Sequence, residues 1–443
     1  MKELNLTEGP IFKKLILFSI PMIIGNLLQQ IYNIVDSLIV GNFIGREALA
    51  SVGSAYSLMV FLTSIIIGLC MGSGAYFSED YGKKNNKDLK DDIWHSFWLI
   101  LITTIIICLI IYPTINLLLV ILQIPEELIS MMKEYLLIVF AGLPLIFLYN
   151  FFAFLQRSVG RTISPLDFLG ISSLLNIVLD LYFVITLKMG VSGAALATII
   201  SQAVSGIGLA IYSFISLPIL KDKTYKFEFN SKRLLQIVKN DFSTCIQQSV
   251  MNFGILMIQG LVNSFGTIIM AAFAAAVKID TLAYMAAQEF GNAYSLFVSQ
   301  NYGIQAKDRI KEGTKKAIFI SIVFCLIISI IIFFTAENLV SCFVEDKDIE
   351  TIQEGAKYLR IEGSMYIGIG ILFLWYGYFR GINKPYISLI LTIISLGLRV
   401  LLAYSFAKTT PLGVIAIWLA IPIGWIVADI TGLILYKTKG LQN

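Results

Sequence analysis

The chain has 443 residues, of which 57% are hydrophobic and only 14% are charged, and its formal net charge is +4. Soluble globular domains carry about 25% charged residues, so this composition excludes a large soluble protein and predicts one that crosses a membrane many times. The small positive charge lies in short segments between apolar runs and gives no reason to expect a nucleic-acid partner.

Twelve apolar runs are long enough to cross a bilayer as helices, because about 20 residues at about 1.5 Å rise each cover a hydrocarbon core of about 30 Å. The predicted fold is therefore an all-α membrane protein with twelve transmembrane helices. In chain order, the expected spans are 15–40, 49–77, 97–119, 135–154, 165–187, 191–217, 245–265, 268–298, 317–335, 358–379, 386–406 and 412–436.

Lysine and arginine are distributed unevenly between the loops on the two sides of these spans. Both chain ends and one set of loops carry about 24 of these residues, and the other set carries about 6. Cytoplasmic loops are enriched in positive charge, so we expect both termini on the cytoplasmic side. The clear separation also supports the number of spans, since one missed helix would mix the two sets.

The longest polar interruption, 221–240, lies near the middle of the chain and separates six spans from six. We therefore expect an N-terminal lobe at 1–219, a cytoplasmic linker at 220–240 and a C-terminal lobe at 241–443. Six spans is an even number, so both lobes enter the membrane in the same direction. This predicts two lobes related by a pseudo-two-fold axis along the membrane normal.

Residues repeated at a constant offset of 220 or 221 positions support this division, against the alternative of coincidence among common loop residues. The repeated pairs are Asn42 and Asn263, Gly45 and Gly266, Tyr81 and Tyr302, Gly82 and Gly303, Pro165 and Pro385, and Gly193 and Gly413.

The first span combines an apolar helix with one polar stripe. Residues at helical spacing form this stripe: Asn26, Gln29, Gln30, Asn33, Asp36 and Ser37. A carboxylate at membrane depth costs about 3 kcal/mol even on mild scales, so Asp36 is a candidate functional residue. Pro21, about four turns earlier, removes a backbone hydrogen bond and favours a kink in the helix.

The fifth and sixth spans carry polar residues at a depth similar to that of Asp36. Asn176 and Asp180 are spaced i, i+4 and share a helix face, and Thr198 lies in the following span. Two carboxylates, an amide oxygen and a hydroxyl could form an oxygen cage for a hard cation such as Na⁺. The two carboxylates could instead share a proton, or each residue could be paired within its own neighbourhood.

The second half does not repeat this set, because Met257, Leu396, Val400 and Trp418 stand at the equivalent positions. We therefore expect cation chemistry in the first half only. Neutral polar residues of both halves are expected to line a hydrated substrate cavity, unless they only bond neighbouring helices. These residues are Gln29, Gln30, Asn33, Gln248, Asn252 and Gln259, with Asp280, Tyr284 and Gln288 on the eighth span.

For three further charged residues and for the only histidine, we expect a structural role rather than a role in transport. Lys278, Asp280 and Arg399 are expected to be buried and to neutralise one another. His95 begins the third span next to a charged loop, and we expect it at the surface rather than in a proton relay. The chain has no histidine cluster and no metal-ligand spacing, so we do not expect an enzyme.

These features resemble the multidrug and toxic compound extrusion (MATE) family over nearly the whole chain. The resemblance is strongest in Tyr32-Asn33-Ile34-Val35-Asp36, in Gln300-Asn301-Tyr302-Gly303, and in Asn176-x-x-x-Asp180 with Thr198. Within the family, the chain is most similar to the bacterial and archaeal branch that keeps its carboxylates in the N-terminal lobe. The resemblance implies that Asp36, Asn176, Asp180 and Thr198 bind the coupling Na⁺ or H⁺, and that Pro21 is the bend in the first helix.

The resemblance also implies a secondary antiporter of the bacterial plasma membrane that works as a monomer. It would export cationic amphipathic drugs in exchange for Na⁺ or H⁺, with no cofactor beyond that ion. No ATP-binding motif is visible, so the energy would come from an ion gradient. The alternative is a lipid-linked oligosaccharide flippase, but that function would need a strongly cationic cavity, and only Lys278 and Arg399 offer intramembrane positive charge.

Overall fold

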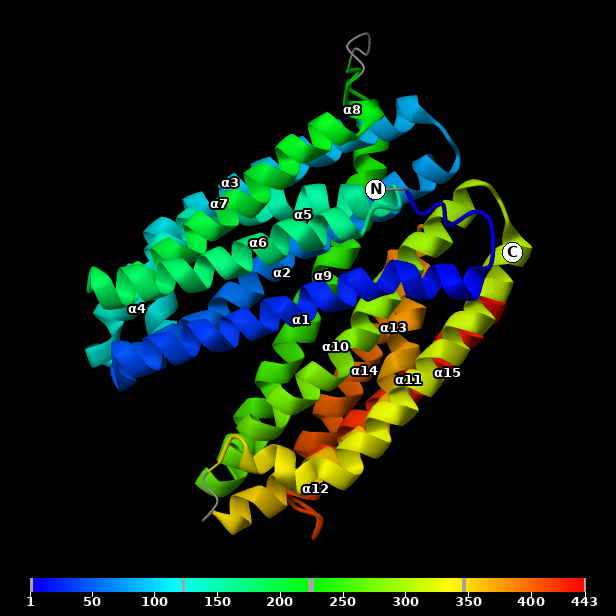
Figure 1. Ribbon diagram of the computed structural model, residues 1–443. Helices are drawn as coiled ribbons and strands as arrows, with labels where there is room; N and C mark the ends of the chain where they lie inside the picture. Colours follow the sequence, from blue (N-terminus) through cyan, green and yellow to red (C-terminus); the bar gives the residue numbers. More distant parts are fainter. Residues whose placement is uncertain (1–2, 122–123, 222–226, 345–347, 442–443) are drawn as a thin grey trace. The chain divides into compact units, whose positions relative to one another are not determined.

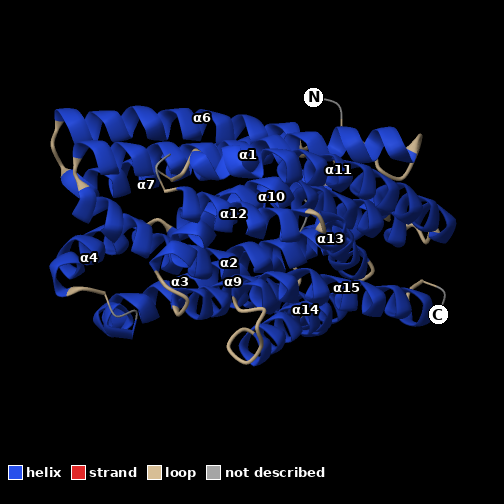
Figure 2. Cartoon of the chain, turned by 90° about the horizontal axis from the view of Figure 1, so that it is seen from below, coloured by secondary structure: helices blue, strands red, loops and turns tan. Residues whose placement is uncertain are grey.

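The computed structural model describes residues 3–121, 124–221, 227–344 and 348–441, and over these residues it contains helices and turns but no strand (Figure 2). The predicted all-α class is confirmed. The first half comprises α1 (Ile11–Phe43), α2 (Arg46–Gly82), α3 (Asn86–Ile121), α4 (Glu126–Ala141), α5 (Leu143–Ser158), α6 (Ile163–Asp180), the π-helix η1 (Leu181–Thr186), α7 (Gly190–Ser216) and α8 (Pro218–Lys221) (Figure 1). The second half comprises α9 (Ser231–Asn263), α10 (Thr267–Gly303), α11 (Lys307–Ser341), α12 (Ile349–Gly363), α13 (Tyr366–Gly381), α14 (Pro385–Phe406) and α15 (Val414–Lys439).

The internal repeat extends to the backbone conformation. Helices α1 and α9 have 33 residues each, and α2 and α10 have 37 each. The residue before each of these longer helices is a glycine at positive φ, Gly45 at 124° and Gly266 at 100°. Residues with a side chain rarely adopt this conformation, which explains why both halves place glycine there. The same turn is therefore built twice, 221 positions apart.

Ten helices of the described residues are long and apolar enough to cross a membrane, or eleven if α4 and α5 count as one span bent by 44°. Two of the predicted spans are not continuous helices. The span at 135–154 is interrupted at Gly142, between α4 and α5, and the span at 358–379 is interrupted at Ser364 and Met365, between α12 and α13. Helix α12 is too polar to qualify as a span by itself.

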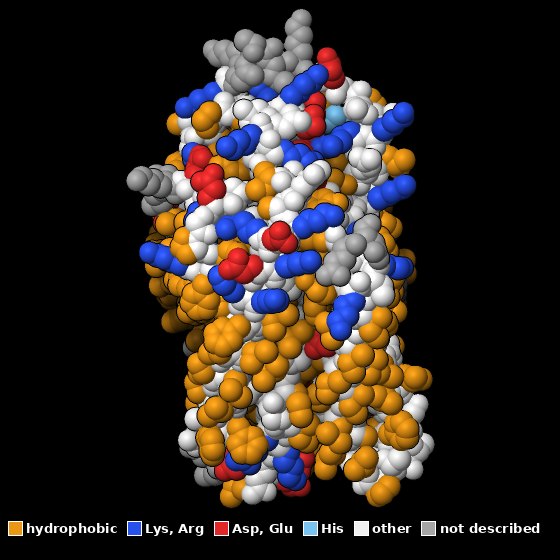
Figure 3. Space-filling view, turned by 90° about the vertical axis from the view of Figure 1, so that its right-hand side faces the viewer, with side chains coloured by type: hydrophobic (Ala, Val, Ile, Leu, Met, Phe, Trp, Pro, Cys, Tyr) orange, Lys and Arg blue, Asp and Glu red, His pale blue; other side chains and the backbone are white. Residues whose placement is uncertain are grey.

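Several helices extend well beyond the predicted apolar runs. Helix α3 begins at Asn86 although its apolar run begins at residue 97, and α9 begins at Ser231 although its run begins at residue 245. Hydropathy marks only the part of a helix inside the bilayer, whereas the backbone hydrogen bonds continue into water. On the face shown in Figure 3, lysine and arginine side chains gather mainly toward one end, and apolar side chains cover much of the rest.

The chain forms two compact units, and the boundary between them falls inside helices. The first unit contains Met1–Asn5 and Ile20–Cys245, and the second contains Leu6–Ser19 and Ile246–Asn443. Of the predicted linker, 220–240, residues 231–240 are helical turns of α9. The start of α1 was expected in the first lobe, but its contacts are with the second unit.

Aromatic packing fills the interior of each unit. In the first unit, Phe77 and Phe97 both contact Phe151 edge to face, with ring centroids 5.8 and 5.4 Å apart. In the second unit, Phe273 stacks on Trp418 with ring centroids 5.4 Å apart. Trp418 occupies the position equivalent to Thr198, so the second unit has a packed aromatic side chain where the first has a hydroxyl group.

Candidate cation site

Helix α1 carries Asp36 and lies against α6, which carries Asp180. A Cβ atom built at Gly25 would lie 3.5 Å from Leu169 of α6. Asp36 and Asp180 each lie 11 residues further along their helices from this contact. Because both helices rise equally per residue, parallel packing at Gly25 and Leu169 brings the two carboxylates to the same level.

The two predicted carboxylates do meet. The carboxyl groups of Asp36 and Asp180 lie close enough to interact directly with each other. Asp180 is fully buried, and neither of its carboxylate oxygens has a hydrogen-bond partner. One oxygen of Asp36, Oδ1, is also buried without a partner. Two carboxylates in contact repel each other unless a proton or a cation lies between them, so this pair has the chemistry of a positive-ion site.

Asn176 and Thr198, the other two predicted ligands, differ in their burial and in their hydrogen bonds. Asn176 lies one turn before Asp180, is 2% exposed, and has no partner for either side-chain polar atom. Thr198 is half-buried on α7, and its hydroxyl donates to the carbonyl oxygen of Ala194 at 3.0 Å, which leaves the hydroxyl oxygen free to accept or to ligate. No recorded contact joins Thr198 to the carboxylates.

Two tyrosines, Tyr32 and Tyr135, also lie beside the carboxylates, and neither was among the predicted site residues. Tyr135 of α4 is buried and close enough to interact electrostatically with Asp36, Asp180 and Tyr32. Tyr32 lies one turn before Asp36 on α1 and accepts or donates a hydrogen bond with Gln29. Their hydroxyl groups place neutral hydrogen-bonding groups beside the acidic pair. Tyr32 was visible only as part of the family-like segment, and Tyr135 had no signal in the sequence.

A π-helix follows Asp180 directly. The amide of Leu187 donates to the carbonyl of Tyr182 at 3.0 Å, five residues earlier, as the wider π-helical turn requires. Gly193 of α7 packs against this turn, because a Cβ atom there would lie 3.1 Å from Cβ of Phe183. The equivalent helix of the second half, α14, contains no such turn over its residues Pro385–Phe406. Short π-helical segments occur mostly at functional sites, which matches the position beside Asp180.

The donor set at this site suits a proton or a hard cation. Buried polar atoms are normally hydrogen-bonded, so unpartnered oxygens on Asp36, Asn176 and Asp180 indicate that something else satisfies them. Carboxylate and amide oxygens are ligands for hard cations, whereas soft metals prefer thiolates and imidazoles. Within the described part of the chain, no group of three or more His, Cys, Asp or Glu side chains could hold a metal ion.

The family model MatE matches residues 21–182 and matches the chain again over residues 242–405. This chain belongs to the MatE family. The two matches begin 221 positions apart, which is the offset of the repeated residues and confirms the internal repeat. As a member of this multidrug efflux family, the protein is a membrane transporter and not an enzyme.

Curated relatives of this MatE protein cover most of its length. It is 28% identical over 401 residues to "Probable multidrug resistance protein YpnP" of Bacillus subtilis (strain 168), covering 89% of this chain and 88% of that protein. It is 25% identical over 420 residues to "Probable multidrug resistance protein NorM" of Thermotoga maritima, covering 92% and 88%. It is 24% identical over 370 residues to "Multidrug export protein MepA" of Staphylococcus aureus (strain MSSA476), covering 83% and 81%.

Solved structures similar to this MatE protein include two conformations of one kind of transporter. "Crystal structure of MATE in the bent conformation" aligns with a TM-score of 0.92 and 25% identity, covering 100% of this chain and 98% of that chain. "Crystal structure of MATE in the straight conformation" aligns with a TM-score of 0.91 and 25% identity, covering 100% and 99%. The fold is thus that of the MATE transporters.

The residues predicted to line a substrate cavity have mixed surroundings. Gln29, Gln30 and Asn33 of α1 are half-buried, as are Gln248, Asn252 and Gln288 in the second unit. Gln259 bonds within its own helix, since its amide nitrogen donates to Asn263 at 2.7 Å. Asp280 and Tyr284 line a cavity inside the second unit, together with aromatic and apolar side chains such as Phe373, Tyr376 and Trp425.

The buried charges of the second unit form a cluster that differs from the predicted one. Asp280 is 4% exposed, lies within hydrogen-bonding reach of Glu362, and interacts with Arg399. Lys278 was expected to join them, but it is exposed, and its amino group lies 6.0 Å from the centre of the Phe343 ring. Glu362 takes its place in the cluster. The sequence contained the signal, because position 362 falls inside the predicted span 358–379.

Proposed function

We propose that this MatE protein is an antiporter that exports amphipathic organic cations in exchange for Na⁺ or H⁺ moving inward. The observation that carries the proposal is the buried, unpartnered carboxylate pair formed by Asp36 and Asp180. Membership of a multidrug efflux family supports export of drug-like molecules over flipping of lipid-linked oligosaccharides. In this scheme, Asn176 and Thr198 complete the ion site, and the coupling ion is a substrate rather than a resident cofactor.

The proposed coupling follows from the charge at the site. Without a positive ion, two carboxylates face each other in a low-dielectric interior, where their repulsion is strong. Binding of Na⁺ or H⁺ removes this repulsion and lets α1 and α6 stay together at Asp36 and Asp180. The charge state of the site thereby favours or opposes the packing of α1 on α6, and α1 is proposed to bend at Pro21 in response.

Exchange requires that drug and ion favour different conformations. A ligand shifts a conformational equilibrium only by the difference between its affinities for the two states. A cationic drug and the coupling ion both carry positive charge, so occupancy of the ion site is expected to weaken drug binding. The proposed drug path follows the polar residues of α1 and the second half. These are Gln29, Gln30, Asn33, Gln248, Asn252, Gln259, Asp280, Tyr284 and Gln288.

The topology completes the proposal. The two six-helix halves act as the moving lobes, and both termini lie on the cytoplasmic side of a bacterial plasma membrane. The excess of lysine and arginine in one set of loops, about 24 against about 6, supports this orientation. The transporter is proposed to work as a monomer, since the ion site is complete within one chain.

Transport by purified protein in liposomes tests the function directly. Ethidium accumulation is measured under an imposed sodium gradient, an imposed proton gradient, or neither. We expect accumulation with at least one gradient, and its loss in Asp36→Asn. The exposed Asp308 of α11 provides a matched control, because Asp308→Asn removes the same charge away from the site. If Asp36→Asn still concentrates ethidium against its gradient, the proposed coupling is wrong.

A further inference from the structure

Helix α9 is one continuous helix, Ser231–Asn263, yet it belongs to both units. Its residues up to Cys245 pack in the first unit, and its residues from Ile246 onward pack in the second. Helix α1 is divided in the same way between Ser19 and Ile20, next to Pro21. The start of α1 therefore belongs to the second unit, and the start of α9 belongs to the first unit.

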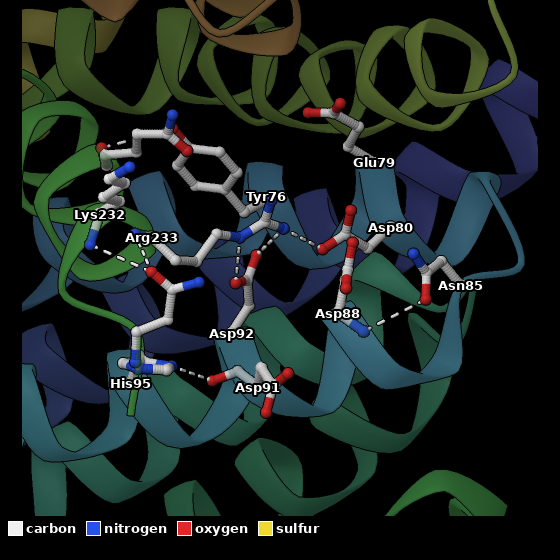
Figure 4. Close-up of polar contacts among 12 residues, drawn as sticks. Tyr76, Glu79, Asp80, Asn85, Asp88, Asp91, Asp92, His95, Lys232 and Arg233 are labelled. Carbon is white, nitrogen blue, oxygen red and sulfur yellow. Dashed lines mark hydrogen bonds and ion pairs between the residues drawn. The ribbon is translucent and has the colours of Figure 1, made fainter. Parts of the chain in front are cut away.

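An ion-pair network fastens the start of α9 to the first unit. Figure 4 shows the guanidinium of Arg233 between Asp92 of α3 and Asp80 of α2. Its Nε and Nη2 atoms lie 2.6 and 2.7 Å from the two oxygens of Asp92, and Nη2 lies 2.6 Å from Asp80. Both aspartates are fully buried. Paired hydrogen bonds of this fork geometry are among the stronger polar contacts in proteins.

A second contact attaches Asn230, the residue that precedes α9, to His95 of α3. The side-chain oxygen of Asn230 accepts hydrogen bonds from the amides of Lys232 and Arg233, both at 3.1 Å, and so caps the helix. The amide of Asn230 donates to Nε2 of His95 at 3.0 Å. The Nδ1 atom of His95 lies 2.7 Å from the carbonyl oxygen of Asp91. His95 was expected at the surface but is only 2% exposed, because Phe227, Phe229 and Asn230, just before α9, pack against it.

Close backbone packing continues the attachment as far as Cys245. The hydroxyl of Ser73 donates to Asp241 at 2.5 Å. A Cβ atom at Gly72 would lie 2.7 Å from Cα of Asp241, and one at Gly68 would lie 2.6 Å from Cα of Cys245. Glycines four residues apart let two helices approach backbone to backbone. Neither site could accept a side chain without separating the helices.

Beyond Cys245, the contacts of α9 belong to the second unit. Gly254 packs against Leu396 of α14, since a Cβ atom there would lie 2.8 Å from the leucine side chain. The hydroxyl of Tyr404, also on α14, donates to the carbonyl oxygen of Met257 at 3.2 Å. The helix thus changes partners between Cys245 and Gly254 without a break in its backbone.

We propose that α9 contains a pivot just after Cys245, and that residues 231–245 stay attached to the first unit throughout transport. The Arg233 network is then a permanent anchor and not a gate. A gate must separate in every cycle, but separating Arg233 would leave the buried carboxylate of Asp92 without its cation and Asp80 with only the 3.4 Å contact to Lys83. This inference rests on the proposed function only in requiring that the two units move during transport.

A disulfide across the anchor tests the proposal. In a variant without the five native cysteines, Ser73→Cys and Asp241→Cys are combined and oxidised, and bond formation is checked by mass spectrometry. We expect the oxidised protein to keep at least half of the ethidium transport rate of the reduced protein. Loss of transport on oxidation, with recovery on reduction, would overturn the pivot. The single-cysteine variants, treated identically, control for oxidation itself.

Distances between spin labels test the pivot independently of transport. Labels at Lys87 of α3 and Lys232 of α9, both exposed, report on the anchor, and labels at Lys232 and Lys307 of α11 report on movement between units. Between samples with and without ethidium and Na⁺, the 87–232 distance should stay constant and the 232–307 distance should change. A shift in the first distance, or a constant second distance, contradicts the proposal. If the reduced protein shows no gradient-driven transport while these distances behave as expected, the proposed function fails and the pivot stands.

Discussion

The carboxyl groups of Asp36 and Asp180 meet although 144 positions separate them in the chain. The same two helices also meet nearer their starts, where a Cβ atom at Gly25 of α1 would lie in ordinary contact with Leu169 of α6. Equal steps of 11 residues along two parallel helices then bring both acids to one level. The pair is a consequence of helix packing, and several predictions depend on its being a single unit.

The first prediction concerns the two carboxylates together. Because one positive ion is proposed to lie between both carboxylates, Asp36→Asn and Asp180→Asn are each expected to reduce gradient-driven ethidium transport at least tenfold. The double variant should be no worse than either single one, since residues acting as a unit are not additive. Liposome assays with the three variants measure this. Independent, multiplying losses would show that the two acids do not share an ion.

The second prediction concerns the π-helical turn after Asp180. Gly193→Leu forces a side chain against Phe183, and overpacking of this kind costs about 1–3 kcal/mol. We expect a lower melting temperature in detergent and weaker dependence of transport on the ion gradient. Gly170→Leu, on α6 where a Cβ atom meets nothing within 4 Å, is the matched control. Equal transport in both variants would mean that the turn does not position Asp180.

The third prediction separates the real charge cluster of the second unit from the expected one. Arg399→Leu leaves Asp280 and Glu362 buried without their cation, a change that costs about 3–5 kcal/mol. Lys278→Leu removes an exposed charge and should change stability by less than about 0.5 kcal/mol. Thermal unfolding of the purified variants measures both. Similar melting temperatures would indicate that Arg399 is not needed to balance the acids.

The fourth prediction concerns the amino-terminal segment of the second unit. Arg309 donates hydrogen bonds to the carbonyl oxygens of Leu6, Glu8 and Gly9, at distances from 2.9 to 3.3 Å. Arg309→Gln should therefore release this segment, with hydrogen exchange at residues 6–9 at least tenfold faster. Lys311→Gln removes an exposed charge two residues away on the same helix and should leave the exchange rates as they are.

The fifth prediction concerns Arg233 and its two aspartates. Arg233→Gln leaves Asp92 buried without its cation and Asp80 with only Lys83, at 3.4 Å, so the free energy of unfolding should fall by about 3 kcal/mol. Adding Asp80→Asn and Asp92→Asn should restore much of this loss, because no buried charge then lacks a partner. Lys232→Gln, at an exposed neighbouring position, is the control. A triple variant no more stable than Arg233→Gln would mean that the charges do not determine the stability of this anchor.

Some features could not be predicted because they depend on contacts between distant segments. His95 stands next to a charged loop in sequence, yet the segment just before α9, residues 227–230, packs against it and buries it. Glu362 was available to inspection, but only its proximity to Asp280 and Arg399 explains how a carboxylate is accommodated there. The breaks at Gly142 and at Ser364 and Met365 lie inside apolar runs, where hydropathy does not distinguish a continuous helix from a bent one.

The sequence by itself determined the membrane class, the all-helical fold, the internal repeat and the family, because hydropathy, periodicity and a constant offset are properties of local order along the chain. It also indicated that Asp36, Asn176 and Asp180 are costly residues in a bilayer. Only the tertiary structure decided which of them meet, where α9 changes units, and that a π-helix follows Asp180. Those outcomes depend on which helices pack together and how closely. Small residues such as Gly68 and Gly72, which meet partners far away in the chain, decide this in α9.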